Sequence, residues 1–230
     1  MRPWDCGGVR ADMPEFSHYF TDNGTMESDE RTLSIQYSDT EFTFVTDSGV
    51  FSKTRLDDGS RILLDALSGM DVSGRVLDLG CGWGAIGIIL MKAIMRAPMP
   101  ITDSTTIPIT DTSSVAFADV NPRAAALTRR NLQINGLGRS AEVYVSDGVA
   151  DVPGMFDWII TNPPIRAGKS VVCGMIRAAA DRLNQGGRLA LVVRRQQGAE
   201  SMLRFLQEIF PRVDVPAKHK GYWVLIATNI

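Results

Sequence analysis

Three glycines alternate with other residues directly after a short apolar run that contains an acidic side chain. Residues 76–84 read VLDLGCGWG, and an apolar segment begins at Ala85. Glycine has no side chain, so a ligand can lie against bare backbone at Gly80, Gly82 and Gly84 before a helix begins. The segment therefore predicts a ligand-binding turn between a strand and a helix.

Two classes of ligand fit a turn of this kind. Gly82, Gly84 and Gly87 satisfy the GxGxxG spacing of a dinucleotide site, in which phosphates lie at a helix N-terminus. Asp78 stands just before these glycines, where its carboxylate would repel a pyrophosphate and attract a cation. S-Adenosylmethionine carries a sulfonium and an ammonium group and no phosphate. It is therefore the expected cofactor, with NAD as the alternative.

A second segment, Thr161-Asn162-Pro163-Pro164-Ile165, ends another apolar run, FDWII. Two prolines at a strand end hold a loop rigid with its carbonyl groups pointed outward. An amino group conjugated with a ring or a carbonyl is planar, and its N–H groups can donate to the Asn162 side-chain oxygen and the Pro163 carbonyl. This positions the nitrogen for methyl transfer without a strong base. Asn162, Pro163 and Pro164 are the expected catalytic residues.

The composition excludes several classes of protein. The 230 residues are 44% hydrophobic and 22% charged, as in a soluble globular chain, and the formal net charge is −2. No apolar stretch approaches the ~20 residues that span a bilayer, and the N-terminus lacks a secretory signal, so we expect a cytoplasmic protein without a membrane partner. Cys6, Cys81 and Cys173 have no CxxC spacing, and His18 and His219 have no metal-ligand spacing, so no metal is expected.

Short apolar strands alternate with helices from residue 76 onward. We expect strands at 76–79, 115–118, 142–145, 156–161 and 189–193, and helices at 85–96, 122–135, 171–184 and 199–209. Such a βαβ series predicts an α/β fold with a Rossmann-like, doubly wound, mostly parallel sheet. The pair 213–215 and 223–227 is expected to add a C-terminal antiparallel strand.

Residues 1–70 are expected to form an N-terminal extension that packs on a catalytic domain at 71–230. Alternation over 32–45 predicts a β-hairpin, and a helix is expected after Gly59 with Ser60 as its N-cap. Residues 98–114 are rich in Pro, Thr, Ser and Asp and contain no Lys, Arg or Glu. We expect a surface insertion there; the alternative is a lid over a ligand.

VLDLGCGWG resembles the first motif of the Rossmann-like, S-adenosylmethionine-dependent methyltransferases. The strings NPPIRAGK, GVFSKTRLDDGSRILLDAL and KGYWVL are similar to a narrower group, the small-domain (MTS-type) class I enzymes that methylate guanine N2 of small-subunit ribosomal RNA. The resemblance runs from about residue 18 to residue 227, with a break at 98–114. It implies that Phe51 and Ser52 line the site, and that the cofactor is held by Asp78, Gly80, Cys81, Gly82 and Gly84.

Two acidic residues compete for the ribose of the cofactor, which sheets of this kind bind at the end of the second strand. Asp103 has the usual spacing from the glycine turn but ends no strand. Asp119 closes the strand VAFAD and precedes Asn121-Pro122, a helix start, so we expect Asp119 to bind the ribose. Asp147, after the strand EVYVS, resembles the position that meets the adenine amino group.

Basic side chains follow the later strands. Doubly wound sheets bind ligands at the carboxyl edge, where these positions fall. We expect Ile165 to pack on a base and the basic residues to form a rim that contacts ribosomal RNA or the small ribosomal subunit. The basic residues are Arg166 and Lys169 after NPPI, Arg194 and Arg195 after the fifth strand, and Lys218 and Lys220 in the last turn.

The leading interpretation is methyl transfer to an exocyclic amino nitrogen, namely guanine N2 of small-subunit ribosomal RNA. The NPP motif also serves enzymes that methylate adenine N6 or a protein glutamine amide, which Ile165 in place of an aromatic residue and the GVFSK segment disfavour. Two alternatives come from other functional classes. An NAD-dependent oxidoreductase would retain NAD in place of S-adenosylmethionine. A non-catalytic RNA-binding protein would bind without turnover.

Overall fold

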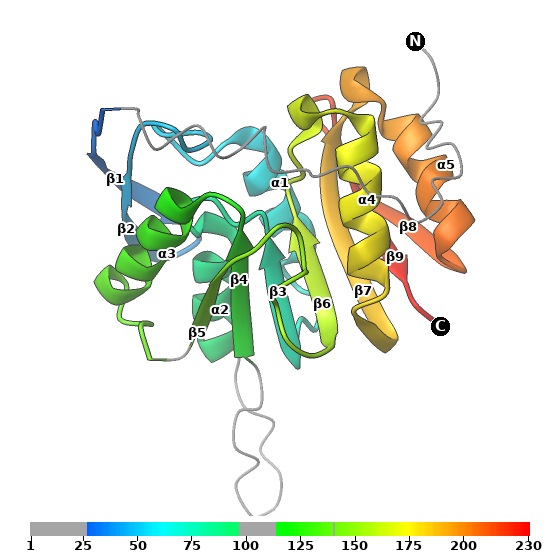
Figure 1. Cartoon of the computed structure of the whole chain (residues 1–230), viewed down its shortest axis with the longest axis horizontal. Coiled ribbons are helices and arrows are strands. Elements are labelled where there is room, and N and C mark those ends of the chain that lie inside the picture. Colours follow the sequence, from blue (N-terminus) through cyan, green and yellow to red (C-terminus); the bar gives the residue numbers. More distant parts are fainter. Residues whose placement is uncertain (1–26, 97–113, 140) are drawn as a thin grey trace, which may run out of the picture.

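A seven-stranded sheet forms the centre of the computed structural model, which describes residues 27–96, 114–139 and 141–230 (Figure 1). The predicted insertion at 98–114 lies outside the described residues except for Ser114, and Asp103 lies outside them too. The strand order is β5-β4-β3-β6-β7-β9-β8. The strands are β3 (Arg75–Leu79), β4 (Ser114–Asp119), β5 (Ala141–Val145), β6 (Phe156–Thr161), β7 (Leu183–Arg194), β8 (Arg212–His219) and β9 (Tyr222–Thr228).

The sheet confirms the predicted Rossmann-like, mostly parallel architecture. Strands β3 to β7 run parallel to one another, whereas β9 runs antiparallel to both β7 and β8. The order reverses between β3 and β6, because β4 lies on one side of β3 and β6 on the other. The connections after these two strands diverge, and ligands bind at the carboxyl edge of such a switch point.

Helices cover both faces of the sheet and bury two separate apolar clusters. One cluster includes Leu63, Ile88 and Leu132, which come from three helices on the same face, and the other includes Ile176 and Phe205 on the opposite face. All five of these side chains are at most 2% exposed. The helices are α1 (Asp58–Leu67), α2 (Ala85–Arg96), α3 (Pro122–Ile134), α4 (Lys169–Ala180) and α5 (Ala199–Ile209).

The predicted hairpin is present as strands β1 (Arg31–Tyr37) and β2 (Thr40–Thr46), which form a separate two-stranded sheet beside α3 (Figure 1). The fully buried side chain of Asn131 on α3 joins the hairpin to the main fold. Its Nδ2 donates to the carbonyls of Val45 and Trp83, and its Oδ1 accepts from the Val45 N–H. One amide thus satisfies three backbone groups from two parts of the chain.

The main differences from the expected helix boundaries are at the start of α1 and the end of α4; α4 also begins two residues earlier than predicted, and α3 ends one residue earlier. The N-cap of α1 is Asp57, whose Oδ1 accepts from the N–H groups of Gly59 and Ser60, so the predicted Ser60 cap is wrong. Helix α4 ends at Ala180, because the chain is then captured by the sheet and Leu183 pairs with Phe156 of β6. Side-chain capping at Asp57 and strand pairing at Leu183 both overrode the local apolar periodicity.

Candidate active site

The glycine turn after β3 exposes bare backbone. Gly80 and Gly82 have φ angles of 70° and 58°, and a Cβ at either position would meet no atom within 4 Å. The N–H groups of Gly80 and Cys81 both donate to the carbonyl of Ala118, which fixes the turn to the end of β4. The turn is therefore held open beside free space, and side chains other than glycine are disfavoured there by the backbone conformation.

The opposite side of the same turn is packed against α3. A Cβ on Gly84 would lie 3.0 Å from Cγ2 of Thr128, and the Thr128 hydroxyl donates to the carbonyl of Gly82. The sulfur of Cys81 lies 3.6 Å from the same hydroxyl. Burial raises the pKa of the Cys81 thiol well above its ordinary value. The Cys81 side chain thus faces the helix.

Two carboxylates flank the turn, that of Asp78, which is buried, and that of Asp119, which is partly buried. Asp78 is 2% exposed and accepts a 2.8 Å hydrogen bond from the Gly87 N–H at the start of α2. Burial raises the pKa of Asp78 to about 7; the Gly87 N–H opposes this rise and the Asp119 carboxylate adds to it. In the part of the chain that the structure describes, no basic side chain is bonded to either acid, and such a pair of acids favours a cationic ligand.

Asp119 lies at the end of β4 and reaches the glycine turn directly. Its Oδ2 accepts from the Gly82 N–H at 2.8 Å, and its Oδ1 accepts from the Asn121 N–H at 2.9 Å. Burial raises the pKa of this carboxyl as well. A carboxylate has about four acceptor sites, so two remain for hydroxyl donors. Asp147 is exposed after β5, the strand next to β4.

Asn162 follows β6, and its side-chain amide is held by the start of α1. Its Nδ2 donates to Asp57 Oδ1 at 3.2 Å and to Ser60 Oγ at 3.1 Å. With both N–H groups of the amide engaged, the remaining polar atom is Oδ1, which can only accept. The Asn162 side chain is therefore oriented as a hydrogen-bond acceptor at the carboxyl edge of the sheet.

The residues after Asn162 form a tight turn. The Pro163 carbonyl accepts from the Ile165 N–H, and the Pro164 carbonyl accepts from the Ala167 N–H, both at 2.8 Å. These bonds lead into the short helix η3 (Ile165–Ala167). The Pro163 carbonyl keeps one of its two lone pairs for a further donor. Ile165 is half-buried and packs on the core beneath α4 and α5.

Sequence reasoning missed the role of Asp57 and Ser60 at this site. Asp57 is 105 residues from Asn162, so no local pattern connects them. The available signal was the string DDGS before an apolar run, which is typical of a helix N-terminus. That signal identifies a cap but not the residue that the cap also binds.

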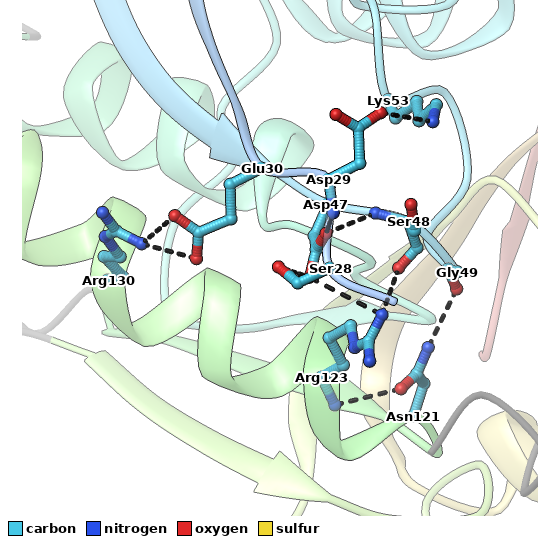
Figure 2. Close-up of polar contacts among 10 residues, drawn as sticks. All are labelled: Ser28, Asp29, Glu30, Asp47, Ser48, Gly49, Lys53, Asn121, Arg123 and Arg130. Carbon is cyan, nitrogen blue, oxygen red and sulfur yellow. Dashed lines mark hydrogen bonds and ion pairs between the residues drawn. The ribbon is translucent and has the colours of Figure 1, made fainter. Parts of the chain in front are cut away.

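A loop between β2 and α1 is tied to the glycine turn and to the start of α3. The Asn121 Nδ2 donates to the Gly49 carbonyl at 3.1 Å, and Arg123 donates to the Ser48 carbonyl at 3.0 Å, as Figure 2 shows. Arg123 also lies 3.6 Å from the Asp47 carboxylate. Further along, the Trp83 indole N–H donates to the Phe51 carbonyl at 2.9 Å. These bonds hold the loop next to the glycine turn.

Phe51 and Ser52 lie at the outer part of this loop. The Phe51 side chain is 68% exposed, although its carbonyl is bound by Trp83. Ser52 has a φ of 56°, and its hydroxyl donates to the Arg55 carbonyl. Phe51 and Ser52 therefore belong to a loop that lies beside the glycine turn. Their role near the cofactor stays a prediction from the family resemblance.

The predicted basic residues separate into two groups. Lys218 and Arg166 do not line the pocket formed by the other four. The ammonium group of Lys218 lies 3.7 Å from the ring centre of Trp223, and Arg166 is exposed on η3. The other four line a single pocket of about 720 Å³ at the carboxyl edge of the sheet, and they are Lys169, Arg194, Arg195 and Lys220.

Among the residues that the structure describes, no group of three or more His, Cys, Asp or Glu side chains is arranged to hold a metal ion. Over the same residues, no helix has both the length and the apolar character needed to cross a bilayer.

Comparison with known proteins identifies the class. Residues 41–226 match the family model of the methyltransferase small domain, and the chain belongs to this family. The matched region includes nearly all of the hairpin strand β2, the loop at 47–56, strands β3 to β8 and most of β9.

Individual relatives give a narrower comparison. The chain is 37% identical to the uncharacterized protein YbxB of Bacillus subtilis, over 93% of this chain and 98% of that protein. It is 36% identical to ribosomal RNA small subunit methyltransferase C of Aeromonas hydrophila, over 81% of this chain but 50% of that protein. The chain thus spans about half the length of the methyltransferase C relatives that it matches.

Solved structures agree with the fold. The 16S rRNA N2 G1207 methyltransferase (RsmC) of T. thermophilus, in complex with AdoMet and guanosine, superimposes with a TM-score of 0.72 at 27% identity, covering 87% of this chain and 51% of that chain. A ribosomal protein L11 methylase from Lactobacillus delbrueckii gives a TM-score of 0.59 at 18% identity, which is a likeness of fold alone.

Proposed function

We propose that this protein is an S-adenosylmethionine-dependent methyltransferase that acts on an exocyclic amino nitrogen, namely guanine N2 of small-subunit ribosomal RNA. The observation that supports the proposal most directly is that Asp57 and Ser60 bind the amide nitrogen of Asn162, which leaves Oδ1 as the side-chain atom that can accept from a substrate. An acceptor at this position suits a substrate with an NH₂ group.

The cofactor site has the features that S-adenosylmethionine requires. The open backbone at Gly80 and Gly82 would receive the methionine part, and the acceptor sites left on Asp119 would bind the ribose hydroxyls. Asp147 is assigned to the adenine amino group. The negative charge of Asp78 and Asp119 suits a cation and disfavours the pyrophosphate of NAD. When bound, S-adenosylmethionine supplies an electrophilic methyl group on a sulfonium.

The acceptor loop acts by positioning. Asn162 Oδ1 and the free lone pair of the Pro163 carbonyl accept the two N–H groups of the substrate amine, which fixes the direction of the nitrogen. These acceptors strengthen their hydrogen bonds as the nitrogen becomes more positive and more acidic during methyl transfer. No strong base is required, because the proton leaves a nitrogen whose acidity has already risen.

The relatives support the choice of substrate. The methyltransferase C proteins are named for ribosomal RNA of the small subunit, and the T. thermophilus structure contains guanosine. The present chain corresponds to about half of each, so its substrate and partners are assigned here by proposal. The small ribosomal subunit or its free RNA is the proposed partner.

The direct test is methyl transfer from labelled S-adenosylmethionine to 16S ribosomal RNA and to small subunits from a strain that lacks the protein. We expect N2-methylguanosine in the nuclease digest, detected by mass spectrometry. Label in N6-methyladenosine or in a protein glutamine, with none in guanosine, would reject the substrate and retain the amino-methyltransferase chemistry. Retention of NAD in place of S-adenosylmethionine would reject the cofactor.

The variant Asn162→Ala tests whether the Asn162 side chain positions the substrate amine. It should lower the single-turnover rate by roughly 100-fold or more, the scale for losing an oriented hydrogen bond in a reaction site. Cofactor affinity, measured by calorimetry, should remain close to wild type. An unchanged single-turnover rate would show that the NPPI loop is structural.

A further inference from the structure

The pocket beside the acceptor loop concentrates positive charge in a chain whose net charge is −2. Its lining comes from three separate segments: the first residue of α4, the region from the end of β7 into α5, and the turn between β8 and β9. Among the described residues that line it, Glu200 alone carries a carboxylate. The five cationic residues are Lys169, Arg194, Arg195, Arg204 and Lys220.

Two of these residues, Arg195 and Arg204, have contacts that offset little of their charge. Arg195 lies 3.8 Å from Glu200, and both side chains are more than half exposed, so their attraction is weak. Arg204 donates to the Ser201 hydroxyl at 3.2 Å, which leaves its charge unpaired by that contact. Like charges gathered in one hollow repel one another, and an anion would relieve that repulsion.

Arg194 connects the pocket to the acceptor loop. Its Nε donates to the Tyr222 hydroxyl at 2.6 Å, and its guanidinium lies 4.8 Å from the centre of the same ring. The Tyr222 ring in turn packs on Gly59, where an added Cβ would be 3.0 Å from Cε1. Gly59 belongs to the same helix start as Asp57 and Ser60, which hold Asn162.

The sheet register gives the same proximity. Thr161, the residue before Asn162, pairs with Leu191 on β7, and Arg194 follows three residues later. Neighbouring parallel strands lie about 4.8 Å apart. The pocket is therefore beside the loop that would position the target amine, at the carboxyl end of β7.

We infer that this pocket binds backbone phosphodiesters of the RNA strand that carries the target nucleotide. Arginine and lysine side chains converging from three segments are the donors that phosphate oxygens prefer. A volume of about 720 Å³ is larger than one phosphate group needs, which favours a stretch of polynucleotide backbone. This inference rests on the proposed function for its choice of RNA, and it adds Arg204 and the first turns of α5 to the substrate-binding surface.

The test uses a double variant, Arg204→Gln with Lys220→Asn. Arg204 is exposed on α5, and asparagine tolerates the φ of 47° at position 220, so both changes remove charge without straining the fold. The matched control is Arg139→Gln with Arg212→Gln. These two exposed arginines precede β5 and begin β8, so they lie at the amino edge of the sheet, away from the pocket.

Binding of full-length 16S ribosomal RNA by the whole chain should be measured at several salt concentrations, without cofactor. We expect the pocket variant to lose roughly tenfold or more in affinity, and its slope of log Kd against log salt to fall by about one for each phosphate contact removed. The control should behave as wild type. The single variant Arg204→Gln gives the same test with a smaller loss if the turn substitution lowers the Tm.

Two results would overturn the inference. One is an unchanged RNA affinity and salt slope in the pocket variant. The other is displacement of RNA from the pocket by guanosine monophosphate at equal phosphate concentration, which would make a free nucleotide the ligand. Because binding is measured without methyl transfer, a wild-type protein that fails to methylate RNA would reject the proposed function and leave this result standing.

Discussion

The side-chain amide of Asn162 donates to the carboxylate of Asp57, which is also the N-cap of α1, at 3.2 Å across 105 residues of chain. One carboxylate thus performs two tasks, because the oxygen that accepts from Gly59 and Ser60 also accepts from Asn162. The start of a helix and the orientation of the proposed catalytic amide are therefore set by the same side chain.

The two tasks of Asp57 can be separated by substitution. Serine is a good N-cap residue, but its side-chain oxygen is one bond closer to the backbone than the carboxylate oxygens of aspartate. Asp57→Ser should therefore keep α1 and lose the bond to Asn162. We expect roughly a tenfold lower turnover with nearly unchanged stability and KM. Asp57→Ala should show the same kinetic loss and in addition about 1 kcal/mol lower stability. Equal turnover for Asp57→Ser and wild type would refute the positioning role.

Cofactor binding should depend on Gly82 and Asp119. Gly82→Val places a branched side chain at a φ of 58° in the open cradle, and Asp119→Ala removes the proposed ribose acceptor and the bond to the Gly82 N–H. Calorimetry should show at least a tenfold loss of S-adenosylmethionine affinity for each. Asp103→Ala is the control, and loss of binding in that variant alone would make Asp103 the ribose ligand.

The pKa of Asp78 predicts a pH dependence near neutrality. Burial raises this pKa from 3.8 to about 7, so the folded protein binds a proton more tightly than the unfolded chain does. The contribution of Asp78 to stability should therefore fall as the pH rises from about 4 to about 7, and should stay level above that range.

Cofactor affinity should change with pH in the opposite direction. A cationic ligand favours the carboxylate, so below pH 7 binding releases up to one proton and affinity should rise by up to about tenfold per pH unit. Above pH 7 Asp78 is already ionised, and affinity should level off. Calorimetry in buffers of different ionisation enthalpy measures that proton. Asp78→Asn should flatten both profiles, and a wild-type affinity that is constant between pH 6 and pH 8 would contradict the assignment.

Asn131 should be a major source of stability for the hairpin. Replacing it with alanine leaves the Val45 N–H and the carbonyls of Val45 and Trp83 without their partner in a fully buried position. We expect a loss of about 2–5 kcal/mol in the free energy of unfolding. Gln133→Ala, at an exposed position on the same helix, should change it by less than about 0.5 kcal/mol in a urea titration. Similar values for both variants would contradict this role.

Local patterns were sufficient for most of the framework. The ranges predicted for β6 and α5 agree with the structure at both ends, and the range predicted for α2 agrees at its start, because these boundaries are marked by glycine, proline or a clear change of period. The strand that ends at Asp119 was also found, and with it the choice of Asp119 over Asp103. That carboxylate does contact the glycine turn, although its role toward the ribose stays a prediction.

Tertiary structure alone decided how distant residues meet. Asp57 binds Asn162, Arg204 joins a pocket with Lys169 and Lys220, and Lys218 is held on Trp223 instead of joining them. The sequence placed Asn162, Lys169 and Lys220 after predicted strands and put Arg204 in a predicted helix, since periods of two and 3.6 residues mark those elements. Which side chains face one another depends on strand order, register and helix direction, and these are set by long-range packing that no local pattern records.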